Sequence, residues 1–348
     1  MAAATGIYPP SPANRLGLAY RQEAALLPWK AGAGGIIDAH MHIHGPPEGP
    51  ARIFFEVADL FGIQRVWSQT QLEEVDALRA VYGQRIAFVA IPNYNLAREG
   101  GDILGDWLQR LEAFAAKGAR LAKFWSAPRG RDFDPSFVLD HPIRVAVMQR
   151  ARALGMAIMT HVADPDTWFQ THYRDSRRDG TKSQQYEPLE RLLDQFHDVP
   201  WLGAHMSGDP EHLDHLQGLL DRHGNYVIDT SATKWMVREL SKHPGEFRDF
   251  CRRNPGRVFF GSDIVVGAHD DPATAFDHYA SRYWSMRTLL ETDYQGPSPI
   301  VDPDLQLLDP SLPATSTAEL RGAAFDPATL QMVYADAARG WEERLARR

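Results

Sequence analysis

Residues 35 to 44 read GIIDAHMHIH, a short alternation of apolar and polar residues that predicts a strand. Successive side chains of a strand point to opposite faces, so the apolar side chains share one face: Ile37, Ala39, Met41 and Ile43. The polar side chains share the other: Asp38, His40, His42 and His44. The apolar face suits packing against helices, which leaves the polar row where a barrel interior ordinarily has Val, Ile or Leu. Two imidazoles two residues apart suit a metal ion with bonds of about 2.0–2.1 Å, and the alternative is a chance pair on a surface strand.

Short β-branched or apolar runs bounded by Gly, Pro and Asp recur along the chain. With the first run they predict eight strands, at residues 35–44, 65–70, 85–93, 119–128, 156–165, 201–210, 225–233 and 257–267. Helical patterns lie between them, for example at residues 106–118, 141–155 and 187–196, and the first two of these end on a glycine. Strands and helices therefore alternate.

This alternation favours an α/β fold, a single (β/α)8 TIM barrel, over an open doubly wound sheet. No Gly-x-Gly-x-x-Gly turn follows the first strand, which weakens the nucleotide-binding alternative. The length of 348 residues alone fits one barrel with insertions about as well as two domains. We expect an N-terminal extension at residues 1–34 and a barrel domain at residues 35–348, with an irregular excursion at residues 294–326 and a C-terminal helix.

The composition, 44% hydrophobic and 24% charged, is that of a globular chain. A net charge of −8 gives no basic surface for nucleic acid or for an anionic membrane, so we expect a small-molecule partner. The N-terminus lacks a secretory pattern and no apolar run reaches about 18 residues, which together indicate a cytoplasmic protein. The single cysteine, Cys251, is expected to pack in a helix, and a homo-oligomer is compatible with the sequence.

Three later residues can bind a metal and lie near the carboxyl ends of predicted strands. His161 ends the fifth strand, His205 the sixth and Asp263 the eighth. Barrel enzymes assemble their active sites at these strand ends. Each residue alone is compatible with an ordinary core position, but together with His40 and His42 they predict a metal site.

These motifs resemble the amidohydrolase superfamily, in particular the amidohydrolase-related branch that includes aminocarboxymuconate semialdehyde decarboxylase. The resemblance covers most of residues 35–340. It rests on IIDAHMHIH at 36–44, TH at 160–161, AHMSGDP at 204–210, VIDTSA at 227–232 and FFGSD at 259–263. The stretch VYADAAR at 333–339 resembles the final helix motif of that branch, with Asp336 where asparagine is usual.

The resemblance implies that one divalent metal is bound by four residues: His40, His42, His161 and Asp263. It also implies that His205 acts on the substrate or on metal-activated water. Zinc is the first expectation, and manganese or another first-row metal suits the same ligands. Some superfamily members carry a modified lysine that bridges two metals at the position of Lys123, whose ordinary interpretation is a charged side chain near the rim. We expect a single metal, with Asp38 hydrogen-bonded behind its ligands.

Aromatic and cationic residues follow two of the strands: Trp125 follows the fourth, and Lys234 and Trp235 follow the seventh. They suit a planar, carboxylated ligand, and the alternative is ordinary loop packing. The longest connection, TWFQTHYRDSRRDGTKSQQYEPLE at 167–190, either covers the site or is a surface insertion.

The predicted function is a metal-dependent hydrolase of a small, carboxylated lactone, amide or ester. Metal-activated water attacks the substrate, Asp263 accepts its proton, and His205 orients the water or stabilises the oxyanion. One alternative is a metal-dependent, non-oxidative decarboxylase of an unsaturated or aromatic carboxylic acid, because similar sites on one fold perform either reaction. A second is a noncatalytic metal-binding protein.

Overall fold

The computed structural model describes residues 8–30 and 35–347. Residues 1–7 and 31–34 of the expected N-terminal extension lie outside the described residues. The chain divides into two compact units: one runs to Val66 and resumes at Thr230–Ala338, and the other comprises Trp67–Asp229 and the chain from Arg339 onward. The assignment of residues 35–348 to one barrel domain stays a prediction.

The main sheet has the strand order β8-β7-β6-β5-β4-β3-β2-β1-β9. Strand β1 pairs in parallel with β9, and each neighbouring pair from β3 to β7 is also parallel. The strands are β1 Ile36–Ile43, β2 Ile63–Gln69, β3 Ile86–Ala90, β4 Leu121–Trp125, β5 Ala157–His161, β6 Trp201–Gly203, β7 Tyr226–Asp229, β8 Val258–Phe259 and β9 Val265–Val266. Each of the eight predicted strands overlaps at least one of them.

Backbone hydrogen bonds flank β8 on both sides within the first unit. The amide of Ala39 on β1 donates to the carbonyl of Phe260 at 2.8 Å, and the amide of Thr230, directly after β7, donates to Phe259 at 2.9 Å. With the parallel strand order and the helices between strands, these bonds confirm the predicted (β/α)8 fold class.

Most of the strands are shorter than predicted, and two of them end or break near a site residue. The sixth ends at Gly203 because His205 has a φ of 57°, which no extended strand accommodates. The eighth is interrupted between β8 and β9, where Asp263 also has a φ of 57°. The alternation of residue types gives no sign of these turns, because it reports hydrophobicity and not backbone dihedral angles.

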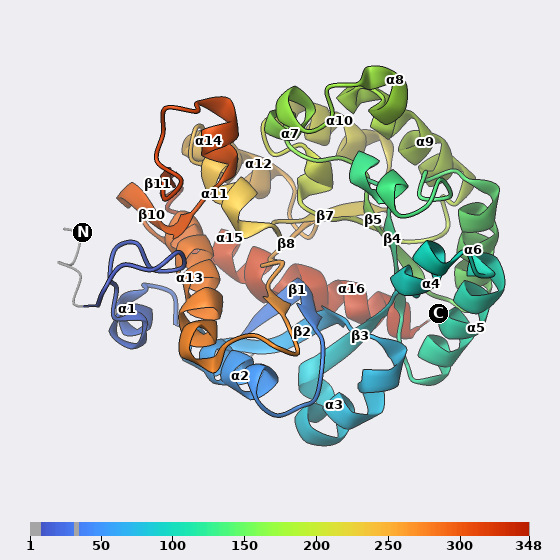
Figure 1. Cartoon of the computed structure of the whole chain (residues 1–348), viewed down its shortest axis with the longest axis horizontal. Helices are drawn as coiled ribbons and strands as arrows, with labels where there is room; N and C mark the ends of the chain where they lie inside the picture. The colour runs from blue at the N-terminus through green and yellow to red at the C-terminus, as the bar shows by residue number, and fades with distance from the viewer. Residues whose placement is uncertain (1–7, 31–34, 348) are drawn as a thin grey trace. The chain divides into compact units, whose positions relative to one another are not determined.

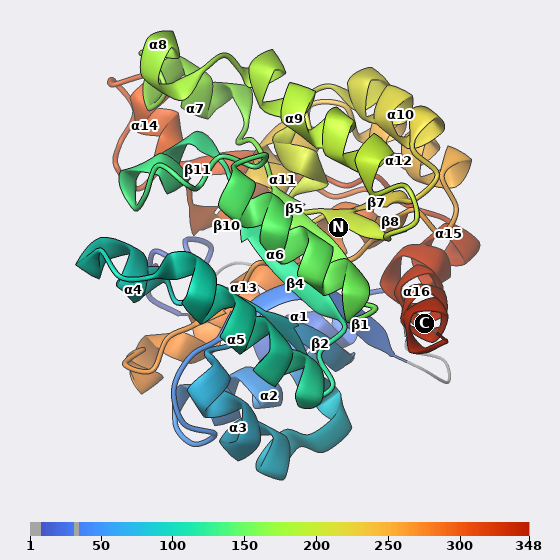
Figure 2. The ribbon, with the colours of Figure 1, turned by 90° about the vertical axis from the view of Figure 1, so that its right-hand side faces the viewer.

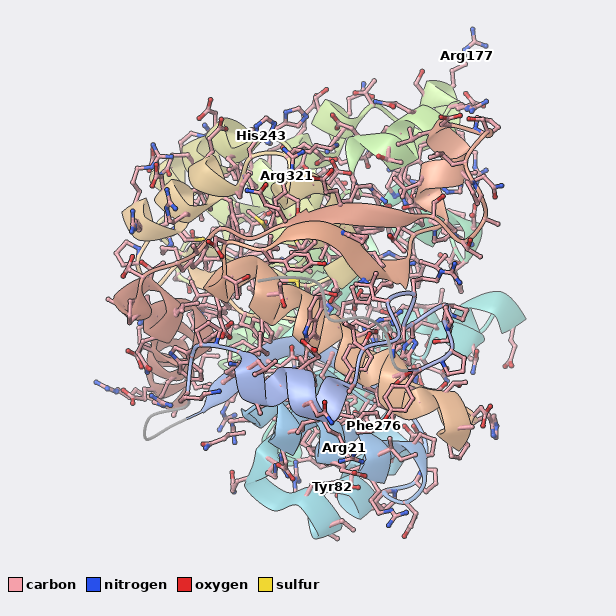
Figure 3. All side chains as sticks on the ribbon, turned by 90° about the vertical axis from the view of Figure 1, so that its left-hand side faces the viewer. Arg21, Tyr82, Arg177, His243, Phe276 and Arg321 are labelled. Atoms are coloured by element: carbon pink, nitrogen blue, oxygen red, sulfur yellow. The ribbon has the colours of Figure 1, made fainter. Side chains whose placement is uncertain are left out.

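In the first unit, the long helix α13 packs against both α1 and α2. In Figure 1 the long helix α13 lies beside α1 and α2, and in Figure 3 the labelled Arg21 and Phe276 join α1 to α13, with the guanidinium 4.4 Å from the ring centroid. The helices are α1 Tyr20–Leu26, α2 Pro50–Leu60, α11 Thr233–Leu240, α12 Pro244–Arg253, α13 Pro272–Glu291, α14 Asp304–Leu308, α15 Pro327–Gln331 and the π-helical turn Met332–Asp336, before α16 Ala337–Ala346, which continues into the second unit. The expected C-terminal helix is therefore present.

The second unit repeats strand and helix from β2 to β7. Figure 2 shows α5 and α6 side by side, and in the core beside them the rings of Trp107 and Phe124 lie 4.7 Å apart. Its helices are α3 Val75–Tyr82, α4 Tyr94–Glu99, α5 Ile103–Ala116, α6 Pro142–Ala153, α7 Asp166–Thr171, α8 Ser176–Asp179, α9 Lys182–Gln195 and α10 Leu213–Arg222. Short 3-10 turns lie at Leu72–Glu74, Gly83–Arg85, Pro128–Asp132 and Met206–Gly208. The predicted helices at 106–118, 141–155 and 187–196 correspond to α5, α6 and α9.

The expectation of an irregular excursion at residues 294–326 is wrong over much of its length. The strands β10 Gln295–Val301 and β11 Thr317–Arg321 pair there in an antiparallel sheet. Pro297 and Pro299 lack amide hydrogens, so the sequence predicts a loop here. A two-stranded sheet tolerates both prolines because each of its strands is an edge strand, which leaves one side of its backbone unpaired. The excursion is therefore a folded hairpin.

Cys251 is buried on α12, as expected. Within residues 8–30 and 35–347, no helix is long and apolar enough to cross a membrane.

Candidate metal centre

The two histidines of β1 lie side by side in the first unit. Their ring centroids are 5.8 Å apart. The His40 side chain is 1% exposed and that of His42 is 24% exposed. One imidazole is therefore embedded in the fold while its neighbour remains accessible to a small ligand.

Asp263 joins this pair from the turn between β8 and β9. Its amide donates to the carbonyl of His40 at 2.8 Å, which fixes the turn against β1. Its Oδ1 lies 3.5 Å from Nε2 of His40 and 3.2 Å from Nε2 of His42. The ligand atoms of the three residues lie within 4.8 Å of one another. Two imidazole nitrogens and one carboxylate oxygen are a donor set that suits zinc and other first-row divalent metals.

Ser231 orients the ring of His40. Its hydroxyl oxygen lies 3.0 Å from Nδ1 of His40, and both side chains are buried. The hydrogen bond at one ring nitrogen sets which nitrogen is available to a metal. Nε2, the atom that faces Asp263, is therefore the nitrogen that His40 could offer to a metal.

Asp38 is fully buried and ties β1 to the turn that carries Asp263. Its Oδ1 accepts from the amides of Ser262 at 3.0 Å and His40 at 3.2 Å, and its Oδ2 accepts from the hydroxyls of Ser262 at 2.6 Å and Tyr283 at 2.9 Å. Burial raises the pKa of Asp38 to about 7, and these hydrogen bonds oppose the rise. The structure thus places Asp38 behind two of the predicted ligands.

Lys234 and Trp235 lie in the first turn of α11, and both are half-buried. The preceding residue, Thr233, donates its hydroxyl hydrogen to the carbonyl of Ser262 at 3.0 Å. The start of α11 is therefore bonded to the turn that presents Asp263. The substrate contacts of Lys234 and Trp235 stay predictions.

His161 and His205 lie together in the second unit. His161 is the last residue of β5 and His205 follows β6 by two residues. Their ring centroids are 4.4 Å apart in an edge-to-face arrangement. Nε2 of His161 lies 2.7 Å from Oδ1 of Asp164, and the amide of His205 donates to Oδ1 of Asp229 at 2.9 Å.

The turn that carries His205 has an unusual backbone. His205, Met206 and Ser207 have φ values of 57°, 49° and 58°, a conformation that costs side chains other than glycine about 1–3 kcal/mol each. At Gly208, whose φ is 74°, a Cβ would lie 1.9 Å from the carbonyl oxygen of Ala163, so only glycine fits. The turn is therefore packed tightly against the residues that follow His161.

The other two residues predicted from the second unit are on β4. Lys123 is 3% exposed, so it is buried within the strand and not at an exposed rim. Trp125 is half-buried, and its ring lies 5.0 Å from that of Phe133 and 6.1 Å from that of Tyr94. Its contact with substrate stays a prediction.

Several residues that contact the predicted ones had no role assigned from the sequence: Asp164, Tyr173, Asp229, Ser231 and Ser262. Asp164 and Asp229 are acidic residues inside predicted strand segments, a signal that could have identified them. Tyr283 lies 245 residues from Asp38 and carries no local signal.

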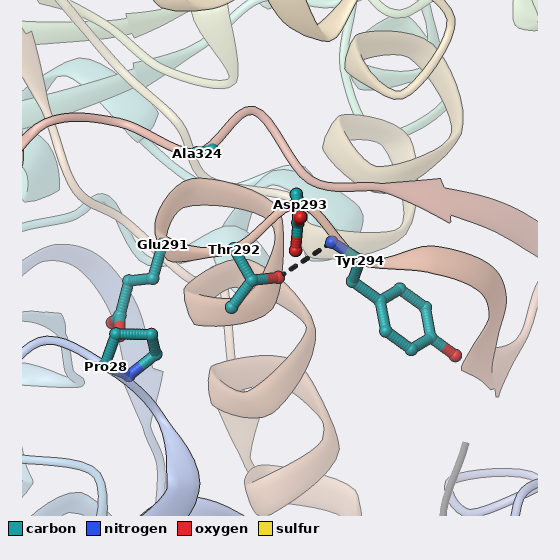
Figure 4. Close-up of a pocket in the computed structure, with 6 residues that line it drawn as sticks. All are labelled: Pro28, Glu291, Thr292, Asp293, Tyr294 and Ala324. Carbon is teal, nitrogen blue, oxygen red and sulfur yellow. Dashed lines mark hydrogen bonds between the residues drawn. The ribbon is translucent and has the colours of Figure 1, made fainter. Parts of the chain in front are cut away.

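A cavity of about 280 Å³ in the first unit contains none of the predicted site residues. It is lined by Pro28, Glu291, Thr292, Asp293, Tyr294 and Ala324. Figure 4 shows these residues and the hydrogen bond from the amide of Tyr294 to Oγ1 of Thr292, at 3.1 Å. The carboxylate of Glu291 already accepts hydrogen bonds from Arg287 and Tyr334.

No family model matches the chain. No curated protein matches it either. Among solved structures, the chain is similar to a probable 2-pyrone-4,6-dicarboxylic acid hydrolase from Acinetobacter baumannii with citric acid bound, at 13% identity and a TM-score of 0.45, over 73% of this chain and 92% of that chain.

Two decarboxylases are also similar in structure. One is 2,6-dihydroxybenzoate decarboxylase from Rhizobium, at 11% identity and a TM-score of 0.48, over 90% of this chain and 99% of that chain. The other is 5-carboxyvanillate decarboxylase from Novosphingobium aromaticivorans, complexed with manganese and 4-hydroxy-3-methoxy-5-nitrobenzoic acid, at 12% identity and a TM-score of 0.44, over 90% of this chain and 98% of that chain.

Proposed function

We propose that the chain is a metal-dependent hydrolase. The observation that carries the proposal is the convergence of His40, His42 and Asp263, whose ligand atoms lie within 4.8 Å of one another at the end of β1. Three protein ligands with room for a further group are typical of catalytic zinc sites. The partial exposure of His42 and Asp263, 24% and 27%, leaves the cluster open to a small molecule.

We propose His161 as the fourth protein ligand and His205 as the group that moves a proton. The support is the position of each residue at the carboxyl end of its strand and the 4.4 Å separation of the two rings. The proposed metal is zinc, with manganese as the first alternative. Because a single ion needs no bridging ligand, Lys123 has no direct role in this proposal.

When bound, the metal acts as a Lewis acid that polarises a carbonyl oxygen and lowers the pKa of water. Asp263 accepts a proton from the attacking water at a carboxylate oxygen as the new carbon–oxygen bond forms. His205 donates a proton to the departing oxygen or nitrogen as the lactone, ester or amide bond breaks. The products are a carboxylic acid and an alcohol or amine.

The proposed substrate is small and carries a carboxylate. Lys234 supplies the cation that would pair with it, and Trp235 and Trp125 supply flat apolar surfaces. The net charge of −8 supports a small molecule as partner in place of nucleic acid. The single, buried cysteine is compatible with the proposed cytoplasmic location.

The test is a panel of lactones, esters, amides and unsaturated or aromatic carboxylic acids, offered to the zinc-loaded and manganese-loaded chain. Release of acid from a carboxylated lactone, ester or amide, lost in the His42→Ala variant, is the expected result. Release of carbon dioxide in place of acid would replace hydrolysis by decarboxylation. A chain that binds metal and turns over no member of the panel would support a noncatalytic metal-binding protein.

A further inference from the structure

Asp164 and Tyr173 form a hydrogen-bonded pair behind His161 in the second unit. Oδ1 of Asp164 lies 2.7 Å from Nε2 of His161, and the hydroxyl of Tyr173 donates to Oδ2 of Asp164. Asp164 is 1% exposed and Tyr173 is 6% exposed. Both oxygens of a buried carboxylate are therefore committed, one to the histidine and one to the tyrosine.

We propose that Asp164, held by Tyr173, is a positioning residue that fixes the His161 ring for metal binding. The inference rests on the proposed function, in which His161 is a ligand. A carboxylate accepts hydrogen bonds, so the bond to Asp164 places the imidazole hydrogen on Nε2 and leaves the lone pair on Nδ1. A histidine that binds a metal through one nitrogen characteristically donates from the other to a carboxylate, which fixes the tautomer and the ring orientation.

Tyr173 acts in this arrangement only as a donor. Burial raises the pKa of Tyr173 well above its ordinary value, and the neighbouring charge of Asp164 raises it further. The hydroxyl therefore keeps its hydrogen, and that hydrogen remains available to Oδ2 of Asp164.

The segment between β5 and α9 holds Tyr173 in this position. The amide of Tyr173 donates to the carbonyl of Trp168 at 2.9 Å, and its ring packs 5.1 Å from that of Phe169. At the base of the segment, Nζ of Lys182 lies 2.8 Å from Oδ1 of Asp166 and 3.2 Å from Oε2 of Glu211. The two ends of the segment are thus tied together by a partly buried ion pair.

The backbone between His161 and Asp164 is fixed as well. Ala163 packs directly against Gly208: a Cβ atom added at Gly208 would lie 1.9 Å from the carbonyl oxygen of Ala163. The amide of Ser126 on the other side donates to the carbonyl of His161 at 2.8 Å. With the backbone fixed on both sides, the remaining freedom of His161 is rotation of its ring, which the bond to Asp164 restricts.

The experiment measures the affinity of the full chain for zinc, after removal of metal with a chelator, by competition with a chromophoric chelator. Asp164→Asn exchanges a charged acceptor for a weaker, neutral one and is expected to weaken zinc binding about tenfold or more. Tyr173→Phe removes one hydroxyl and is expected to weaken binding several-fold. Asp140→Asn is the matched control, because Asp140 is a second-unit carboxylate that accepts from Arg191 at 2.7 Å in an exposed pair. Its affinity should equal that of the wild type.

A second arm repeats Asp164→Asn in a chain that already carries His161→Ala. If Asp164 acts through His161, the substitution has less than about a twofold effect there, since neighbours that act together are not additive. An equal loss in both backgrounds, or wild-type affinity in both Asp164→Asn and Tyr173→Phe, would overturn the positioning role. Failure of the wild-type chain to bind zinc would instead contradict the proposed function, so the two failures are distinguishable.

Discussion

The hydroxyl of Ser262 donates to Oδ2 of Asp38 at 2.6 Å, and this bond joins β1 to the turn that presents Asp263. The two residues are 224 positions apart in the sequence, and both are buried. The strand that carries the two histidines and the turn that carries the carboxylate are therefore held together by a group outside the ligand set.

Substitution of Asp38 by asparagine should loosen both the fold and the metal cluster. An amide at this position presents donor hydrogens to the hydroxyls of Ser262 and Tyr283, which now donate to the carboxylate. We expect a loss of about 1–3 kcal/mol in the free energy of unfolding and a lower metal content. Denaturant unfolding and elemental analysis of one preparation measure both. Asp59→Asn, at an exposed position on α2, is the control, and equal behaviour of the two variants would refute the role of Asp38.

His40→Ala and His42→Ala should each lose metal along with activity, because each removes one of few ligands. The His42 variant is the more informative for function, since His42 is partly exposed and its loss leaves a smaller cavity in the core. His243→Ala is the matched control, because His243, labelled in Figure 3, lies in the same unit with its side chain 57% exposed. Full metal occupancy in either β1 variant would show that the paired histidines are not ligands.

His205→Asn should keep most of its metal and lose about a hundredfold or more in turnover, as expected for a residue that transfers protons. Asparagine is the appropriate replacement because the φ of 57° at this position suits it better than most side chains. Metal analysis and kinetics on the same sample separate the two effects. If metal and activity fall in parallel, His205 belongs among the ligands; normal turnover would remove it from the mechanism.

The stability of the chain should fall between pH 6.5 and pH 4 because of His278. Burial, and after it the positive charge of Arg282, lowers the pKa of His278 to about 4. The unfolded chain therefore binds a proton in this pH range that the folded chain does not, so acidification favours unfolding. Because His278 is partly exposed, we expect about 1 kcal/mol of stability to be lost between pH 7 and pH 5 through this residue. Unfolding midpoints of the wild type and His278→Gln at both pH values measure it, and identical pH dependence in the two chains would contradict the assignment.

The sequence predicted where most strands lie and that His40 and His42 share one face of β1, because both follow from local alternation. It also predicted that Asp263 lies near this pair, while the role of the three residues as metal ligands stays a prediction. It did not predict the positive φ values at His205 and Asp263, since neither residue is glycine and the strand pattern was extended through both. Nor did it predict the bonds of Tyr283 to Asp38 or of Ser231 to His40, which join residues 245 and 191 positions apart. Local sequence patterns contain no information about such distant pairs. They do show the residue types that can bind a metal, here histidine and aspartate.

The direct measurement of the central claim is the metal content of the purified chain, determined by elemental analysis without exposure to chelators and after reconstitution with zinc or manganese. We predict close to one divalent ion per chain, held in part by His40, His42 and Asp263. Two ions per chain would give Lys123 a bridging role. A chain that is isolated metal-free and takes up neither zinc nor manganese would contradict the account.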